Sequence, residues 1–166
     1  MELGDRTGMS HKASSDDRQQ GLAGRTSGEQ ETMFRALHAL ERAIASPAPG
    51  REQAWKQRAQ RELATVVGLL QEHCEWAEAD DGIIGEVEVR LGRSYEVSRA
   101  RRDHERLAHE AVSVLASLDE YAGDSALSFQ EVRRQVAQLT AALRDHQARE
   151  ADLLMLAFQL DVGVPD

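Results

Sequence analysis

Four histidines occur at widely separated places in the chain, and each falls on or beside the apolar stripe of a different predicted helix. They are His38, His73, His104 and His146, and Glu150 follows His146 by one helical turn. A buried neutral imidazole needs partners for both ring nitrogens, and each polar group left unpaired costs about 1–3 kcal/mol. Imidazole nitrogens and carboxylate oxygens are good ligands for iron, zinc, manganese and copper. The sequence therefore predicts that these five residues form a metal site.

A second interpretation of the histidines stays open from the residues alone. A single histidine on an apolar helix face is more often a core residue that is hydrogen-bonded to a carbonyl or carboxylate than a metal ligand. The distribution of one histidine to each predicted helix favours the metal site. Among the neighbouring acidic residues, we expect Asp103 and Asp145 at the surface. We also expect Glu78 at the surface, although it is close enough to His73 in sequence to reach a site near one end of the helices.

Four long segments show the three- and four-residue spacing of apolar side chains that is typical of amphipathic helices. They cover about residues 29–45, 51–80, 95–121 and 128–160, and the segment 83–91 fits either a short helix or a brief strand. The connector SPAPG at 46–50 stops the first helix, and Gly82 is expected to end the second in a left-handed conformation. Ser128 and Glu131 form a capping box for the last. Long amphipathic helices with short connections predict an antiparallel up-down four-helix bundle.

Length and composition support one all-α domain that follows a mobile tail. The chain has 166 residues, of which 41% are hydrophobic and 30% charged, with three prolines and few aromatic residues, a balance typical of helical proteins. Residues 1–28 are rich in Gly, Ser, Asp, Arg and Gln and offer little to bury. We therefore expect a disordered tail at 1–28 and the helical bundle at 29–162.

Charge and cysteine usage argue against several classes of partner. The net charge of -9 disfavours nucleic-acid binding, and the basic run at 99–102 is interrupted by acids on both sides, as on a solvated helix face. Cys74 is the only cysteine, so no internal disulfide is possible. The sequence contains no apolar run of membrane-spanning length and no apolar stretch of a secretory signal. We expect a cytoplasmic protein without a membrane or nucleic-acid partner, and a protein partner stays open.

The order of the candidate ligands is similar to that of a known family. The segments FRALHALE, LLQEHCEWAE, RRDHERL and LRDHQAREADLL resemble the bacterial hemerythrin-like, or HHE cation-binding, domain over about residues 29–160. The resemblance implies a four-helix bundle around a non-haem metal centre, commonly two iron ions bridged by carboxylates, that binds dioxygen or senses redox and oxygen state. The ligand set departs from the family pattern at two positions. Ala77 stands where a bridging glutamate is expected, and Ala108 where many members have a further histidine.

Two functions remain as hypotheses. The first is a hemerythrin-like protein whose mono- or dinuclear non-haem iron binds or senses dioxygen or a related small molecule. The second, which Ala77 and Ala108 favour, is a degenerate bundle without metal that acts as an interaction or structural module. The sequence shows no nucleophile triad, Gly-rich phosphate loop or CxxC pair, and no general acid or base stands out. An enzyme is therefore the less favoured interpretation.

Overall fold

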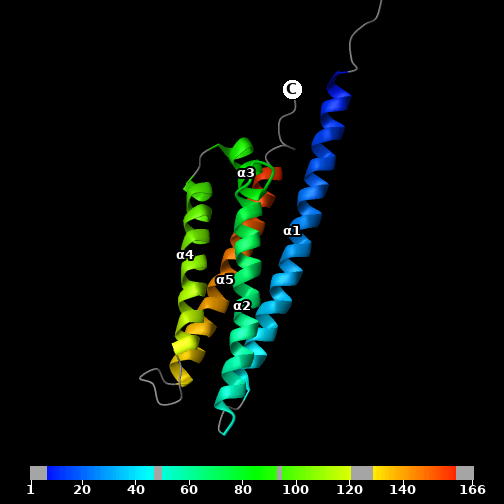
Figure 1. The fold of residues 1–166 in the computed structure, drawn as a ribbon. Coiled ribbons are helices and arrows are strands. Elements are labelled where there is room, and N and C mark those ends of the chain that lie inside the picture. The colour runs from blue at the N-terminus through cyan, green and yellow to red at the C-terminus, as the bar shows by residue number, and fades with distance from the viewer. Residues whose placement is uncertain (1–6, 47–49, 93–94, 121–128, 160–166) are drawn as a thin grey trace, which may run out of the picture.

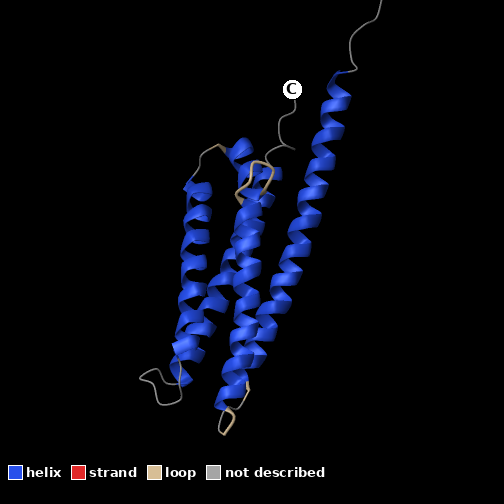
Figure 2. Ribbon diagram, viewed as in Figure 1, coloured by secondary structure: helices blue, strands red, loops and turns tan. Residues whose placement is uncertain are grey.

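The described part of the chain folds almost entirely into helices. The computed structural model describes residues 7–46, 50–92, 95–120 and 129–159. Within these ranges there are five helices and no strand (Figure 2): α1 (Thr7–Ala45), α2 (Glu52–Ala77), α3 (Ile83–Leu91), α4 (Tyr95–Glu120) and α5 (Phe129–Gln159). The all-α prediction is confirmed, and the segment 83–91 is a helix rather than a strand. The capping residue predicted for the last helix, Ser128, lies outside the described residues.

The four long helices lie side by side (Figure 1). α1 contacts α2 and α5, and α4 contacts the same two helices, so the four enclose a common interior. Successive long helices run in opposite directions, and the short helix α3 packs at one end against α2, α4 and α5. Among the described residues, no helix combines the length and the apolarity that a bilayer span requires.

Two apolar clusters fill this interior. The larger cluster draws on all four long helices and includes Leu37, Leu63, Leu107 and Leu139, none of which exposes any surface. The smaller cluster lies at the α3 end of the molecule, where side chains from α2, α3, α4 and α5 pack together with Leu22 of α1. Burial of this apolar surface, at about 25 cal/mol per Å², is the main force that holds the helices together.

Helical periodicity predicts most of the buried positions. All the core positions expected on α4 are buried, namely Val97, Ala100, His104, Leu107, Ala111, Val114 and Leu118. On α1 the same reasoning places Met33, Leu37, Leu40 and Ile44 in the core, as observed. Phe34 is an exception, because half of its side chain is exposed. It lies next to Met33 on the helix and therefore points about 100° away from the buried stripe.

The first helix is longer than the sequence predicts. A disordered tail was expected at 1–28, whereas α1 begins at Thr7, and only residues 1–6 of the tail lie outside the described part. Leu22 is buried in the smaller apolar cluster, and the hydroxyl of Thr26 donates to the Leu22 carbonyl at 2.8 Å. The segment contains no proline, and each of its glycines costs a helix only about 1 kcal/mol relative to alanine. The packed part of the protein therefore begins before Glu29.

Gly82 serves a different purpose from the one predicted. α2 ends at Ala77, and the φ angle of Gly82 is -86°, which is outside the left-handed region. A Cβ atom at this position would lie 2.0 Å from the carbonyl oxygen of Trp76. Glycine is therefore needed for space where the end of α2 meets the start of α3, and its conformational freedom is not used.

Packing of Leu22 against the smaller cluster gives a direct test of the extended helix. We expect Leu22→Ala to lower the free energy of unfolding by about 2 kcal/mol, as for other buried leucines, measured by urea denaturation. Leu156→Ala is the matched control, because 45% of Leu156 is exposed, and its effect should stay below about 0.5 kcal/mol. Equal stabilities of the Leu22→Ala variant and the wild type would show that this part of α1 does not pack.

Candidate metal centre

A layer of polar side chains separates the two apolar clusters. It contains His73 on α2, His104 on α4, and His146 and Glu150 on α5. In each of these helices the apolar residues on one side of the polar position belong to the larger cluster, and those on the other side belong to the smaller one. The polar layer is thus enclosed by hydrocarbon along the helix axis.

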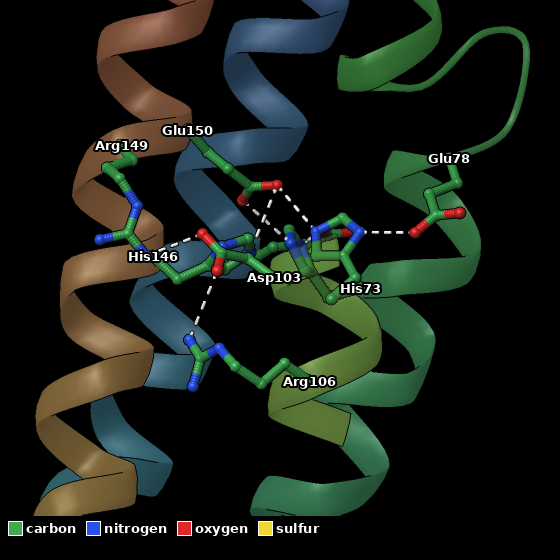
Figure 3. Close-up of polar contacts among 9 residues, drawn as sticks. His73, Glu78, Asp103, Arg106, His146, Arg149 and Glu150 are labelled. Atoms are coloured by element: carbon green, nitrogen blue, oxygen red, sulfur yellow. Dashed lines mark hydrogen bonds and ion pairs between the residues drawn. The ribbon is translucent and has the colours of Figure 1, made fainter. Parts of the chain in front are cut away.

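The three imidazoles and the Glu150 carboxylate meet in this layer, and Figure 3 labels His73, His146 and Glu150 of this group. His104 and His146 are 1% and 2% exposed, Glu150 is 4% exposed, and His73 is partly buried. The ring centroids of the three histidines lie between 4.8 and 5.9 Å apart. One ligating atom from each of the four residues lies within 4.8 Å of the others, so the group could hold a metal ion.

His38 lies outside this group, and the structure does not bring it to the other predicted ligands. Its side chain is exposed, its ring meets the edge of the Phe34 ring, and its Nδ1 lies 3.5 Å from the guanidinium of Arg42. α1 reaches the polar layer at Glu29, which contacts His73. At 1.5 Å per residue, His38 is about 13 Å further along the helix. The helix periodicity gave the face of α1 only approximately and did not give the level of His38 along the axis.

The carboxylate of Glu150 is shared by all three imidazoles. Its Oε1 lies 3.0 Å from Nε2 of His104 and 3.5 Å from Nε2 of His146, and its Oε2 lies 3.0 Å from Nε2 of His73. Burial alone raises the pKa of Glu150, but the contacts with the three histidines outweigh it and hold the pKa well below its usual range. Glu150 is therefore a buried anion at the centre of the layer.

Two of the nitrogens that face Glu150 make no hydrogen bond. The Nε2 atoms of His73 and His146 are buried and have no hydrogen-bond partner among the described residues. The Nε2 of His73 lies 3.0 Å from a Glu150 oxygen and that of His146 lies 3.5 Å from one, but neither contact has the geometry of a hydrogen bond. A buried polar atom left in this way costs about 1–3 kcal/mol, and such atoms are rare in native proteins. Ring nitrogens that converge on a carboxylate without bonding to it are the donor arrangement that a cation would use.

Two further carboxylates contact the outer nitrogens of the rings. Nδ1 of His104 lies 2.7 Å from Oε1 of Glu78, and Nδ1 of His73 lies 3.3 Å from Oε2 of Glu29. Glu78 directly follows α2, and its side chain is 38% exposed, so it reaches the cluster from the surface (Figure 3). Burial lowers the pKa of His73, but Glu150 and Glu29 more than reverse this and raise it. The sequence prediction gave Glu78 a surface position and Glu29 no role.

Asp103 borders the cluster from α4. Arg149 of α5 donates to its Oδ2 at 3.0 Å, and Arg106 donates to its Oδ1 at 3.5 Å (Figure 3). Burial raises the pKa of Asp103, but the charges of Arg149, Arg106 and His146 outweigh burial. The net pKa is lowered, so the group stays ionised. Asp103 was expected to carry only surface charge. Its ion pair with Arg149 also ties α4 to α5 beside the imidazole of His146.

Cavities reach the polar layer from two sides. A cavity of about 420 Å³ lies between α1, α2 and α5 and is lined in part by His73, His146 and Glu150. A second cavity of about 280 Å³ lies between α4 and α5 and also touches His146 and Glu150. Both are larger than a diatomic molecule or a few waters requires. The cluster is therefore buried but can be approached by small solutes.

The register of α1 against α2 indicates Glu29 as a neighbour of His73. His73 lies about six turns after the start of α2, and the same step back from the end of α1 reaches the neighbourhood of Gly24 and Thr26. His38 lies only about two turns before that end. In an antiparallel pair joined by a short connector, residues equally far from the connector are neighbours. Counting from the connector therefore favours Glu29 over His38 as the neighbour of His73.

Comparison with family models, with curated proteins and with solved structures found no match to this chain. The assignment of the site therefore rests on the residues and their geometry. These define one cluster of three histidines and a glutamate, with two carboxylates on its outer side.

The partial burial of Cys74 beside the site leads to a prediction about its reactivity. Burial, together with the nearby carboxylates of Glu78 and Glu150, raises the pKa of the Cys74 thiol to about 12. Since the thiolate is the reactive form, we expect the folded protein at pH 8 to react with iodoacetamide at least about 100-fold more slowly than the urea-unfolded chain, as followed by mass spectrometry. Equal rates in the two states would show that the thiol is accessible and that its pKa is not raised.

Proposed function

We propose that the chain is a hemerythrin-like antiparallel four-helix bundle that binds iron and thereby binds or senses dioxygen or a related small molecule. His73, His104, His146 and Glu150 would hold the ion. The observation that carries this proposal is the pair of buried Nε2 atoms, on His73 and His146, that face the Glu150 carboxylate without a hydrogen bond. The side-by-side packing of α1, α2, α4 and α5 supports the bundle.

The buried charge of Glu150 favours a bound cation over a polar core without a metal ion. Glu150 is almost fully buried and ionised, and an isolated carboxylate in the protein interior is strongly destabilising unless positive charge is nearby. No lysine or arginine supplies that charge, since the groups within reach of the Glu150 oxygens among the described residues are imidazoles. A divalent ion bound by neutral imidazoles would neutralise the carboxylate and satisfy the ring nitrogens at the same time.

The ligand set favours a single ion. Position 77, where the family pattern has a bridging glutamate, is an alanine whose side chain is fully buried, and position 108 is also alanine. Glu29 and Glu78 contact the outer nitrogens of two rings rather than the centre of the cluster. Three imidazoles and one carboxylate are enough for one transition-metal ion but few for two.

Iron is the ion proposed because the resemblance to hemerythrin-like domains favours it and because mixed nitrogen and oxygen ligands suit it. When bound, a redox-active ion with open coordination positions supplies reversible binding of dioxygen or a related small molecule. The residues of the chain would hold the ion, exclude bulk water and leave a route from both cavities. No residue is assigned the role of a general acid or base, so catalysis is not part of the proposal.

A metal-free structural or interaction module is the second candidate. The pKa of His73 is raised and that of Glu150 is lowered, so a proton on the His73 ring can supply positive charge in place of a metal ion. Ala77 and Ala108 fit this candidate because they remove ligands that the family pattern contains. The two candidates differ in what the histidines contribute to stability.

Metal content tests the proposal directly. Protein purified aerobically from iron-supplemented cells should contain about one iron per chain by elemental analysis, with an absorption band absent from the metal-free chain. His104→Ala should lose at least about 90% of the metal, since second-sphere changes alone cost 10–100-fold in affinity. His38→Ala is the matched control and should retain it, because His38 is exposed and outside the cluster. Wild-type protein without any metal would contradict the proposal.

Stability separates the two candidates. Ferrous ion at about 100 times its dissociation constant should stabilise the wild type by about 2.7 kcal/mol, whereas the double variant His73→Leu/His104→Leu should show no such effect. For a metal-free module, added metal would change neither protein. The leucine variant would then melt at a higher temperature than the wild type, because apolar residues replace buried polar groups. Thermal unfolding by circular dichroism, with and without the ion, measures both.

A further inference from the structure

The outer nitrogens of two rings face carboxylates that no ligand prediction includes. His104 has Glu78 at Nδ1 and Glu150 at Nε2, at 2.7 and 3.0 Å. His73 has Glu29 at Nδ1 and Glu150 at Nε2, at 3.3 and 3.0 Å. Each ring therefore lies between an inner carboxylate, shared by the cluster, and an outer carboxylate of its own.

A neutral imidazole carries one N–H, and an ionised carboxylate can only accept a hydrogen bond. If the outer carboxylate accepts the Nδ1–H, the lone pair of the ring is left on Nε2, which points into the cluster. With an ion bound between Nε2 and Glu150, the opposite tautomer would place an N–H against the ion and a lone pair against the outer carboxylate, and both contacts would be repulsive. The outer contacts therefore select the tautomer that presents Nε2 to a metal ion.

We infer that Glu78 and Glu29 are positioning residues of the site, which fix the tautomer and the ring orientation of His104 and His73 and so raise the affinity for the ion. This inference rests on the proposed metal-binding function. It also gives α1 a role at the site: the helix supplies no ligand, because His38 is exposed, but it supplies the carboxylate that orients His73.

The surroundings of the two carboxylates hold them in place. Arg25 lies one turn before Glu29, binds its carboxylate at 3.2 Å, and has its guanidinium 4.4 Å from the centre of the Trp76 ring. Arg25 and Glu29 thus connect α1 to the end of α2 at the level of the cluster. Glu78 caps α2, and its backbone N–H donates to the carbonyl of Cys74 at 3.1 Å, so its backbone is fixed by the helix end.

The contacts that the two carboxylates make with the rings differ in strength. The Glu78 contact is shorter and acts on a ring that is almost fully buried, where a hydrogen bond is worth more. The Glu29 contact is longer, and both Glu29 and His73 are partly exposed. Removal of Glu78 should therefore weaken metal binding more than removal of Glu29.

Zinc affinity tests the inference, measured on the full-length metal-free protein by competition with a chromophoric chelator. We expect Glu78→Ala to raise the dissociation constant about 10–100-fold and Glu29→Ala to raise it less. Glu78→Gln should fall between Glu78→Ala and the wild type, because the amide oxygen can accept the Nδ1–H without the charge. Glu75→Ala on the exposed side of α2 and Glu31→Ala on the exposed side of α1 are matched charge controls and should bind zinc within about twofold of the wild type.

Affinities of Glu78→Ala and Glu29→Ala equal to those of the controls would overturn the inference and leave the metal site intact. Wild-type protein that binds no zinc would instead contradict the proposed function. A second readout does not depend on affinity: nitrogen-15 spectra of the imidazoles in the zinc-loaded protein should show His104 protonated at Nδ1 and bound to the ion through Nε2, with this preference lost in Glu78→Ala. Protonation of wild-type His104 at Nε2 would overturn the inference on its own.

Discussion

The fold depends on how one buried carboxylate is compensated. Glu150 lies between two apolar clusters, in a place where an unpaired anion would strongly destabilise the protein. The three imidazoles that surround it come from three different helices, so any arrangement that compensates Glu150 also fixes the register of α2, α4 and α5. The apolar clusters provide most of the stability, but an apolar stripe alone tolerates shifts along the helix axis. The polar layer tolerates such shifts less, because each imidazole must stay beside the Glu150 carboxylate.

The same constraint organises the parts of the protein around the layer. Glu29 brings α1 to His73, and Glu78 brings the end of α2 to His104, so that the rings are contacted from inside and outside. Asp103 and Arg149 join α4 to α5 beside His146. Cavities on two sides leave His146 and Glu150 within reach of small solutes. The polar layer is therefore held by contacts from all four long helices and open to small molecules from two sides.

Periodicity in the sequence predicts the helices and the buried face of each one, and for α4 it predicts every core position. It therefore also identifies His73, His104, His146 and Glu150, which lie on these faces. It does not fix the level of a residue along the bundle, and the level is what separates His38 from the cluster and brings Glu29 to His73. Glu78 reaches the cluster through the length of its side chain, and Asp103 is held beside it by Arg149 and Arg106. Helical spacing describes neither effect. Leu22 shows a related gap, because a segment of low average hydrophobicity can still pack through a single leucine.

The chemistry of the layer is consistent with two occupants, a metal ion or protons, and only the first gives the protein the function proposed. The most direct test is X-ray absorption at the iron edge on protein loaded with one equivalent of ferrous ion. We expect outer-shell scattering from three imidazole rings around a single iron, reduced when His146 is replaced by alanine. A spectrum with oxygen ligands alone, unchanged by that replacement, would contradict it.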